Sequence, residues 1–469
     1  MTAVRRRFVS ALAAAGLLAA CGLPLVAGPA RAAATASAQL TPNPAEWWFA
    51  GWQVRQRIWP LTEGAGVTVA VLDTGVQATL PDLRGVVLPG GDMTGAGGRG
   101  QTDGNASDDG HGTAVAALIA GQGVGPGIVG IAPRARILPV KVGSEGPDLA
   151  SVAAKAIRFA VASGAQVVEM SFGIQIASPT ACDPVLQAAV AYALARDVIL
   201  VAAAGDANLI HGRSEPGSCA GVLTVGGVEP DGSLWRDSIR EPYVAIAAPA
   251  DRMTFQGPDG RYSSAARGTS FASALVAGAA ALVRSRYPDM PWYRVDQRLI
   301  DTAVPAGRPV PNDGYGYGIA DPARAVDASA YPVRASAPDP VLASFRAWLA
   351  TPQGRAAAAS RPFPQGGRSS PADPSQPGMT MEEIVITAVA SVCVFVAVLV
   401  FVLRMSSRRP AAMTSSHGDR TRGGWEERSW SFGPDEDDEY DGAPGYGRPP
   451  GYGPPPLWTG PPYDPPGWR

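Results

Sequence analysis

The sequence predicts a doubly wound α/β domain, in which helices cover both faces of a mostly parallel sheet. Short apolar runs alternate with Ala-rich segments, and acidic residues stand at the carboxyl ends of two of the runs. Because these runs lack alternating polar residues and are bounded by Gly, Asp or Ser, they are typical of buried parallel strands. The runs are Val67–Leu72, Val167–Phe172, Val198–Ala203 and Val222–Val228.

Two Ala-rich segments between these runs, Leu149–Ala162 and Pro184–Ala195, have apolar residues at helical spacing. Strand and helix therefore alternate along the chain, as in βαβ units. Binding and catalytic sites in such folds gather at the carboxyl ends of the strands. Asp73 and Asp206 both stand at such ends.

Length and charge limit the function classes. The chain has 469 residues, a formal net charge of −2 and 17% charged residues. That length accommodates one large domain, expected over residues 61–330, with attachments on both sides. The low charge gives no reason to expect a nucleic-acid partner.

The N-terminus, residues 1–32, is expected to be an export signal. Three arginines (Arg5, Arg6, Arg7) precede an apolar run, and Ala30-Arg31-Ala32 offers a cleavage site. The arginines also permit a twin-arginine route. Leu18-Ala19-Ala20-Cys21 resembles a lipoprotein box, so a lipidated Cys21 is the alternative to a cysteine that is discarded with the signal.

Residues 33–60 form a short aromatic extension that is too small to fold alone, and we expect it to pack on the main domain. Residues 331–383, rich in Pro, Ala, Ser and Gly, indicate a linker, with a brief amphipathic turn at Val341–Leu349. The tail, 404–469, is expected to be disordered because it combines an acidic cluster with Pro and Gly. A docking role through its aromatic residues is the alternative to a solubilising tail.

An uncharged apolar run, Ile384–Leu403, has the length of a bilayer core. Glu382 and Glu383 precede it, whereas Arg404, Arg408 and Arg409 follow it, so the C-terminal side is expected to be cytoplasmic. We therefore predict a single-pass membrane anchor with the main domain outside the cell.

Cysteine usage agrees with export. Cys21 lies in the signal and Cys393 in the expected span, which leaves Cys182 and Cys219 in the outer domain. An even pair in an oxidising compartment predicts a disulfide, and two unrelated thiols are the alternative.

Three glycine-flanked motifs carry the candidate chemistry: VAVLDTGV with Asp73, DGHGT with His111, and GTSFAS with Ser270. Acid, base and nucleophile in the order Asp, His, Ser match one of the chain orders in which a serine-protease triad is built. Ser270 needs a base to remove its proton, and His111 is the candidate because His211 lies in an apparent loop and His417 beyond the expected membrane span. Ser270 opens a predicted helix over 271–286, whose positive end favours developing negative charge.

From about Gly66 to Ala325 the chain resembles the subtilisin-like serine proteases. Among them it is most similar to the mycosins, the membrane-bound subtilases of type VII secretion systems. The features that narrow the resemblance are Glu46-Trp47-Trp48-Phe49, Pro81–Gly85, Gly130-Ile131-Ala132-Pro133 and the predicted membrane anchor. The resemblance implies serine endopeptidase activity without a cofactor, association with secretion-complex subunits and a non-inhibitory N-terminal extension.

The resemblance also assigns substrate contacts. Ser171, Phe172 and Gly173 match the strand that pairs with substrate backbone, and Ala203, with its two neighbours, matches a wall of the specificity pocket. Gly268 and Thr269 match the turn that presents the nucleophile. The small side chains at 202–204 admit a sizeable substrate residue.

Two carboxylates depart from the family pattern. Asp206 stands where subtilases have an Asn that donates to the oxyanion, and Glu169 also replaces an Asn. An ionised Asp206 cannot donate, so the backbone N–H of Ser270 would remain as the oxyanion donor, whereas a protonated Asp206 could donate. If Asp206 and Glu169 lie close together, each raises the other's pKa. Ala274 and Leu275, in place of Pro and His, are interpreted as a packing change.

The sequence thus predicts an extracytoplasmic, membrane-anchored serine endopeptidase that acts on protein or peptide substrates. The alternative is a structural subunit of a secretion complex, in which proteolysis is secondary. No metal site is expected, because the acidic residues Asp103, Asp108 and Asp109 are interpreted as a solvated loop.

Overall fold

The computed structural model describes residues 40–360, apart from 104–109, 125–126, 144–147, 176–181, 208, 210–211 and 335. The expected signal, membrane span and tail lie outside the described residues, as do Cys21, Asp108, Asp109 and His211. Within the described part of the chain, no helix is long and apolar enough to cross a membrane.

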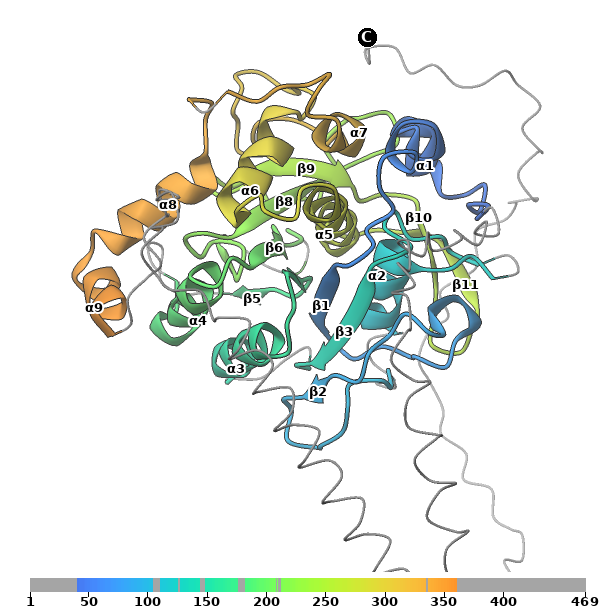
Figure 1. The fold of residues 1–469 in the computed structure, drawn as a ribbon, viewed down its shortest axis with the longest axis horizontal. Helices are drawn as coiled ribbons and strands as arrows, with labels where there is room; N and C mark the ends of the chain where they lie inside the picture. Colours follow the sequence, from blue (N-terminus) through green and yellow to red (C-terminus); the bar gives the residue numbers. More distant parts are fainter. Residues whose placement is uncertain are drawn as a thin grey trace, which may run out of the picture. The chain divides into compact units, whose positions relative to one another are not determined.

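The centre of the domain is a sheet with seven strands among the described residues. All neighbouring strands of this sheet pair in parallel. The predicted doubly wound fold is confirmed (Figure 1). In spatial order the strands are β2 (Gly91–Asp92), β3 (Arg136–Lys141), β1 (Thr68–Asp73), β4 (Val167–Met170), β6 (Ile199–Ala203), β8 (Leu223–Val228) and β9 (Ile246–Pro249).

Helices cover both faces of this sheet. Helix α2 (His111–Ala120) packs against α5 (Thr269–Arg286), and α3 (Leu149–Ala162) packs against α4 (Pro184–Leu194). Helix α5 touches β4, β6, β8 and β9, and it is buried along most of its length. Its small residues allow this close approach, since ten of its eighteen residues are Ala or Gly or Ser.

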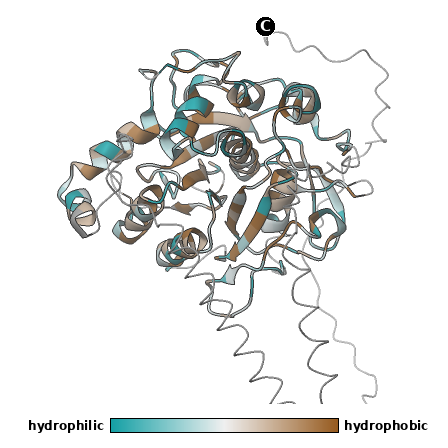
Figure 2. Ribbon diagram, viewed as in Figure 1, coloured by the Kyte–Doolittle hydropathy of each residue, from teal (hydrophilic) through white to brown (hydrophobic). Residues whose placement is uncertain are grey.

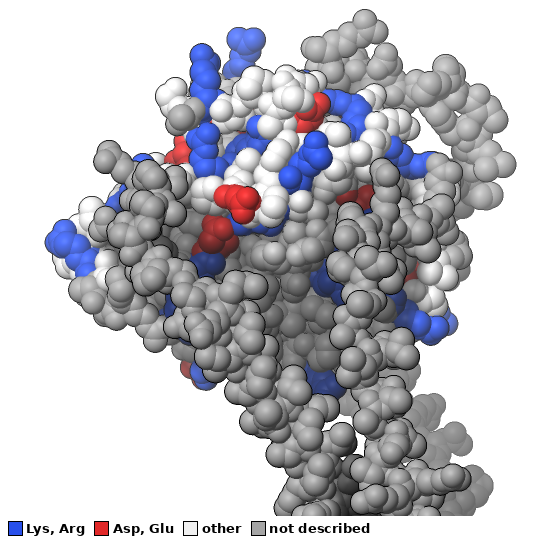
Figure 3. Space-filling view, in the orientation of Figure 1, with Lys and Arg blue, Asp and Glu red and all other residues white. Residues whose placement is uncertain are grey.

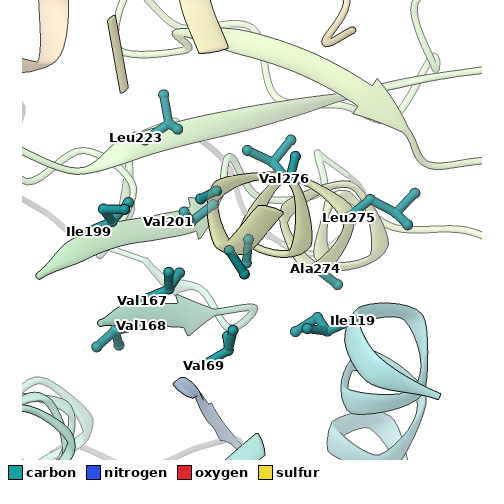
Figure 4. Close-up of a cluster of buried hydrophobic side chains, with 14 of the residues drawn as sticks. Val69, Ile119, Val167, Val168, Ile199, Val201, Leu223, Ala274, Leu275 and Val276 are labelled. Atoms are coloured by element: carbon teal, nitrogen blue, oxygen red, sulfur yellow. The ribbon is translucent and has the colours of Figure 1, made fainter. Parts of the chain in front are cut away.

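The core lies between α5 and the sheet. In Figure 4, Ala274, Leu275 and Val276 of α5 lie opposite side chains of β1, β4, β6 and β8, with Ile119 of α2 beside them. Hydrophobic residues colour much of the central strands and of the helices that pack on them in Figure 2. Ala274 and Leu275 are completely buried, which agrees with their interpretation as packing residues.

Two small antiparallel sheets lie outside the central one. Strand β5 (Ile174–Gln175) pairs with β7 (Ser214–Glu215), and β10 (Met253–Gln256) pairs with β11 (Tyr262–Ala266). The remaining described elements are α1 (Trp47–Gly51), the π-helix η1 (Val54–Ile58), the 3-10 helix η2 (Pro81–Leu83), α6 (Trp292–Asp301), α7 (Pro322–Val326), α8 (Pro340–Leu349) and α9 (Pro352–Ser360).

The aromatic extension packs on the domain. Three indole N–H groups donate to its backbone: Trp47 to Asp251 O (3.2 Å), Trp52 to Ala320 O (2.9 Å) and Trp59 to Ile131 O (2.9 Å). Trp48 is fully buried. The described part of the extension is therefore an integral part of the folded body.

The expected linker begins later than position 331, because α8 packs on the domain. Asp339 caps this helix by accepting from the backbone N–H of Leu342 at 2.9 Å. Phe345 is buried and lies edge-on to Trp292 of α6, with ring centroids 6.0 Å apart. Val341 and Phe345 are one helical turn apart, so the expected amphipathic turn is a ten-residue helix with one buried face.

Candidate active site

Asp73 and His111 meet at the carboxyl end of β1. Asp73 is the last residue of that strand and His111 the first residue of α2. Nδ1 of His111 lies 2.9 Å from each carboxylate oxygen of Asp73, whereas the imidazole side chain remains about one third exposed (32%). The buried carboxylate thus fixes the ring, and part of the ring stays open to solvent.

Gly112 permits this approach. A Cβ on Gly112 would lie 2.2 Å from the carbonyl oxygen of Gly75 and 2.9 Å from the Cβ of Asp73. Any side chain at this position would push α2 away from β1. The glycine after the histidine in the DGHGT motif is therefore required by packing.

Asp103 corrects the expectation of a solvated loop. It is only 3% exposed, and its carboxylate accepts from the hydroxyls of Thr74 (2.8 Å) and Thr113 (2.5 Å) and from the N–H of Thr113 (2.8 Å). The Thr74 hydroxyl in turn accepts from the N–H of Gly112 (3.0 Å). These bonds satisfy free N–H groups in the first turn of α2 and so hold His111 in place.

The charges of the site are strongly coupled. Burial alone lowers the pKa of His111, but the charge and hydrogen bond of Asp73, helped by Glu169 and Asp103, raise it to about 9. Burial opposes ionisation of Asp73 as well, yet the imidazole keeps the pKa of this carboxyl below its ordinary value. The pair is therefore held as imidazolium and carboxylate at neutral pH.

Ser270 stands in the first turn of α5, where unpaired N–H groups point out of the helix. Its hydroxyl donates to the carbonyl oxygen of Ser171 at 2.9 Å. A hydroxyl has one proton, so it must turn away from this carbonyl before a base can accept that proton. Phe271, the next residue, lies beside the imidazole, with ring centroids 6.1 Å apart.

Asp206 lies against the turn that presents Ser270. Its Oδ1 accepts from the N–H (3.0 Å) and the hydroxyl (2.7 Å) of Thr269. Its Oδ2 would be 3.3 Å from a Cβ on Gly268. Burial raises the pKa of Asp206, although the bonds from Thr269 and the charge of His111 partly offset this. One oxygen thus anchors the start of α5 and the other lies beside the turn.

Glu169 has a different carboxylate neighbour from the one considered in the sequence. Its side chain is fully buried, and burial followed by the charge of Asp73 raises its pKa to about 8. Its Oε2 lies 3.0 Å from Ser171 Oγ, which is also 2.8 Å from Oδ2 of Asp73. The charge of Asp73, rather than that of Asp206, is therefore the main carboxylate influence on Glu169.

The residues expected to bind substrate lie next to these groups. Ser171, Phe172 and Gly173 continue the chain directly after β4, and Ala203 ends the neighbouring strand β6. Because β4 and β6 are parallel neighbours, these positions share one edge of the sheet with Asp73. Ala203 is 4% exposed.

Cys182 and Cys219 form the expected disulfide. Glu215 lies close enough to both sulfurs for the three to form a candidate metal group. The disulfide removes both thiolates, so this trio is not available as a ligand set in the structure.

The structural roles of three residues of the site were not found from the sequence. Thr269 donates its hydroxyl proton to the carboxylate of Asp206, Ser273 donates to Oε1 of Glu169 (2.7 Å), and Asp103 caps α2. Ser and Thr are common inside helices and loops, so only their spatial neighbours reveal them. The burial of Asp103 had a weak signal, namely its position shortly before His111.

Comparisons with known proteins show which family the domain resembles. The subtilase family profile matches residues 64–318. Mycosin-1 of Mycobacterium tuberculosis (strain ATCC 25618 / H37Rv) is 34% identical over 328 residues, which cover 59% of this chain and 72% of that protein. Subtilisin DY of Bacillus licheniformis is 34% identical over 260 residues, 55% of this chain and 88% of that protein.

Among solved structures, the MycP3 protease from the type VII (ESX-3) secretion system has a TM-score of 0.52 and 31% identity. The match covers 61% of this chain and 88% of that one. Both kinds of comparison therefore converge on the described domain.

Proposed function

The chain belongs to the subtilase family and is a mycosin-type serine endopeptidase, and from this premise we propose that Ser270, His111 and Asp73 hydrolyse peptide bonds through an acyl-enzyme. The proposal is carried by the contact of His111 Nδ1 with both oxygens of Asp73, together with the packing of the His111 ring against Phe271, the residue after Ser270. That contact leaves Nε2 as the nitrogen available to the nucleophile.

In the proposed reaction, Oγ of Ser270 attacks the substrate carbonyl carbon while Nε2 of His111 accepts its proton. His111 then gives this proton to the leaving amine, and the peptide bond breaks. Water, activated by the same nitrogen, hydrolyses the ester and restores Ser270. Asp73 stabilises the imidazolium that forms twice in this cycle.

Substrate is proposed to lie along Ser171, Phe172 and Gly173, with Ala203 beside its side chain. The backbone carbonyl of Ser171 supports this, because it already accepts a hydrogen bond from Ser270. A substrate N–H that takes this carbonyl would free the Ser270 hydroxyl for His111. Binding of the substrate and activation of the Ser270 hydroxyl would then occur together.

The negative charge of the tetrahedral intermediate is proposed to face the backbone N–H of Ser270 and Oδ2 of Asp206. The N-terminus of α5 supplies partial positive charge at this point. An ionised Asp206 would repel the negative charge of the intermediate and so oppose this stabilisation. We therefore expect slow turnover at neutral pH.

We further propose that the enzyme is anchored in the cell membrane through residues 384–403, with its catalytic domain outside the cell, and that it works with a type VII secretion complex. The apolar run, the basic residues behind it and the likeness to the MycP3 protease support this. The tryptophan side chains of the N-terminal extension bond to Ile131, Asp251 and Ala320, away from the triad residues, which agrees with a non-inhibitory segment. Basic and acidic side chains both occur on the described face in Figure 3, and no nucleic-acid role is proposed.

A fluorophosphonate probe tests the catalytic proposal, because it reacts only with an activated serine. We expect labelling of Ser270 that is abolished in Ser270→Ala and His111→Ala. Equal labelling of the parent and Ser270→Ala would contradict the proposal.

A structural role in the secretion complex is the second candidate function, favoured by the carboxylate at position 206. Complementation of a deletion strain with Ser270→Ala separates the two. Full secretion by this variant would support the structural role, whereas loss of secretion at normal protein level would support proteolysis.

A further inference from the structure

Glu169 is a fully buried carboxyl group that the proposed mechanism does not use. It projects from β4 and links two parts of the site. Its Oε1 is 2.7 Å from the hydroxyl of Ser273 in α5, one turn after the nucleophile, and its Oε2 is 3.0 Å from the hydroxyl of Ser171. The Ser171 hydroxyl is also 2.8 Å from Oδ2 of Asp73.

The number of available protons limits which hydrogen bonds these groups can form at the same time. Ser171 lies between two carboxyl groups but has only one hydroxyl proton to donate. If both Glu169 and Asp73 were ionised, one of the two contacts would bring together two oxygens without a proton between them. If Glu169 is protonated, it donates to Ser171, and Ser171 donates to Asp73.

The surrounding charges favour the same proton arrangement. The charged groups that face Glu169 among the described residues are Asp73 at the end of β1 and His111 at the start of α2, while α5 presents the Ser273 hydroxyl. Asp73 is ionised and paired with His111, so a second buried charge beside it is unfavourable. Burial and the charge of Asp73 raise the pKa of Glu169 to about 8.

We propose that Glu169 is a positioning residue that works as a neutral acid, because its proton fixes the Ser171 hydroxyl as a donor to Asp73 and keeps a second negative charge away from the Asp73–His111 pair. This role rests on the proposed function. Ionised Glu169 reverses both effects: Ser171 has two competing acceptors, and His111 holds its proton more tightly.

The proposal predicts a characteristic pH dependence. His111 must lose its proton to act as a base, and its pKa lies close to that of Glu169. The two groups therefore titrate together, and a single-ionisation curve does not describe activity. The parent enzyme should reach a narrow maximum on the alkaline side and then decline as Glu169 ionises.

Glu169→Gln tests the proposal because a Gln amide mimics the neutral acid. Its N–H can donate to Ser171 and its oxygen can accept from Ser273, but it cannot ionise. We expect the rising limb of kcat/KM to move about one unit to lower pH, to follow a single ionisation, and to lose its alkaline decline. Glu169→Met, which fills the space without a donor, should lower kcat several-fold.

Two measurements keep the test independent of folding and of the proposed function. Thermal unfolding identifies a variant that has lost its fold, and NMR titration gives the pKa of His111 without any activity. We expect this pKa to fall in Glu169→Gln. Glu46→Gln is the matched control, since burial also raises the pKa of Glu46 to about 8 but Glu46 contacts Asn43 and Val129. Glu46→Gln should leave the pH profile of kcat/KM and the pKa of His111 unchanged.

Superimposable pH profiles and equal His111 pKa values in the parent and Glu169→Gln would overturn the proposal. Equal loss of activity in Glu169→Gln and Glu169→Met would also overturn it. If the parent is not labelled by a fluorophosphonate while the His111 pKa still falls in Glu169→Gln, the proposed function fails and the coupling stands.

Discussion

Replacing Asp206 by Asn should accelerate this enzyme. Oδ1 of the carboxylate accepts two hydrogen bonds from Thr269, and an Asn Oδ1 can accept both in the same position. The amide nitrogen then takes the place of Oδ2, beside Gly268, which stands two residues before Ser270. The substitution therefore adds a donor near the proposed oxyanion without removing a contact of α5.

The expected increase in kcat is taken from the known effect of losing an oxyanion donor in other enzymes. In a subtilisin, loss of the side-chain donor costs roughly 10²–10³ in kcat, or about 2.7–4 kcal/mol. A gain of up to this size is expected where Asp206 is ionised. Because burial raises the pKa of Asp206, its protonated form can donate in acid, and the gain should shrink as pH falls.

Peptide hydrolysis by the parent and Asp206→Asn, measured from pH 5 to 9, gives this ratio directly. Asp206→Leu is the control, since it neither donates nor accepts, and it should show no gain. Equal or lower kcat in Asp206→Asn at pH 7 to 8, with unchanged thermal unfolding, would refute a donor role at this position.

Three further predictions concern stability. Asp296 is fully buried, and neither of its carboxyl oxygens has a hydrogen-bond partner among the described residues, so burial raises its pKa well above the ordinary value. The folded state therefore binds the Asp296 proton more tightly than the unfolded state does. As a result, the free energy of unfolding falls as pH rises from about 4. Asp296→Asn should remove this slope and raise Tm at pH 7, and an unchanged slope would contradict the assignment. Phe345→Ala should cost about 3 kcal/mol by calorimetry, whereas an unaffected Tm would mean that α8 is not part of the folded body. Cys182→Ser with Cys219→Ser should lower stability by about 4 kcal/mol, and a loss below 1 kcal/mol would contradict the loop-entropy reasoning.

The fold was predictable where one physical signal dominated. Buried parallel strands such as β1 and β6 are continuous apolar runs, and α3 coincides with the predicted helix. Strand β3 was not among the predicted strands, because it begins with Arg136, ends with Lys141 and contains Pro139. Proline normally argues against an internal strand, and only pairing with β1 reveals this one.

The site was predictable as a set of residue types but not as a network. Sequence motifs predicted Asp73, His111 and Ser270 as the triad, because each lies in a short glycine-containing motif and the three follow in the order Asp, His, Ser. They could not reveal that Asp103 is buried or that Glu169 is coupled to Asp73 through Ser171. Such couplings depend on which side chains meet across β1, β4 and α5, and chain order does not encode that.

Fluorophosphonate labelling of the full-length protein, scanned across pH and mapped by mass spectrometry, tests the central claim most directly. Because Asp73 raises the pKa of His111 to about 9, most imidazole groups are protonated at pH 7, so the labelling rate should be low there. We predict that the label is found on Ser270 and that its rate rises above pH 7 to a maximum on the alkaline side. A rate that is independent of pH, or a label on another serine, would contradict the proposed triad.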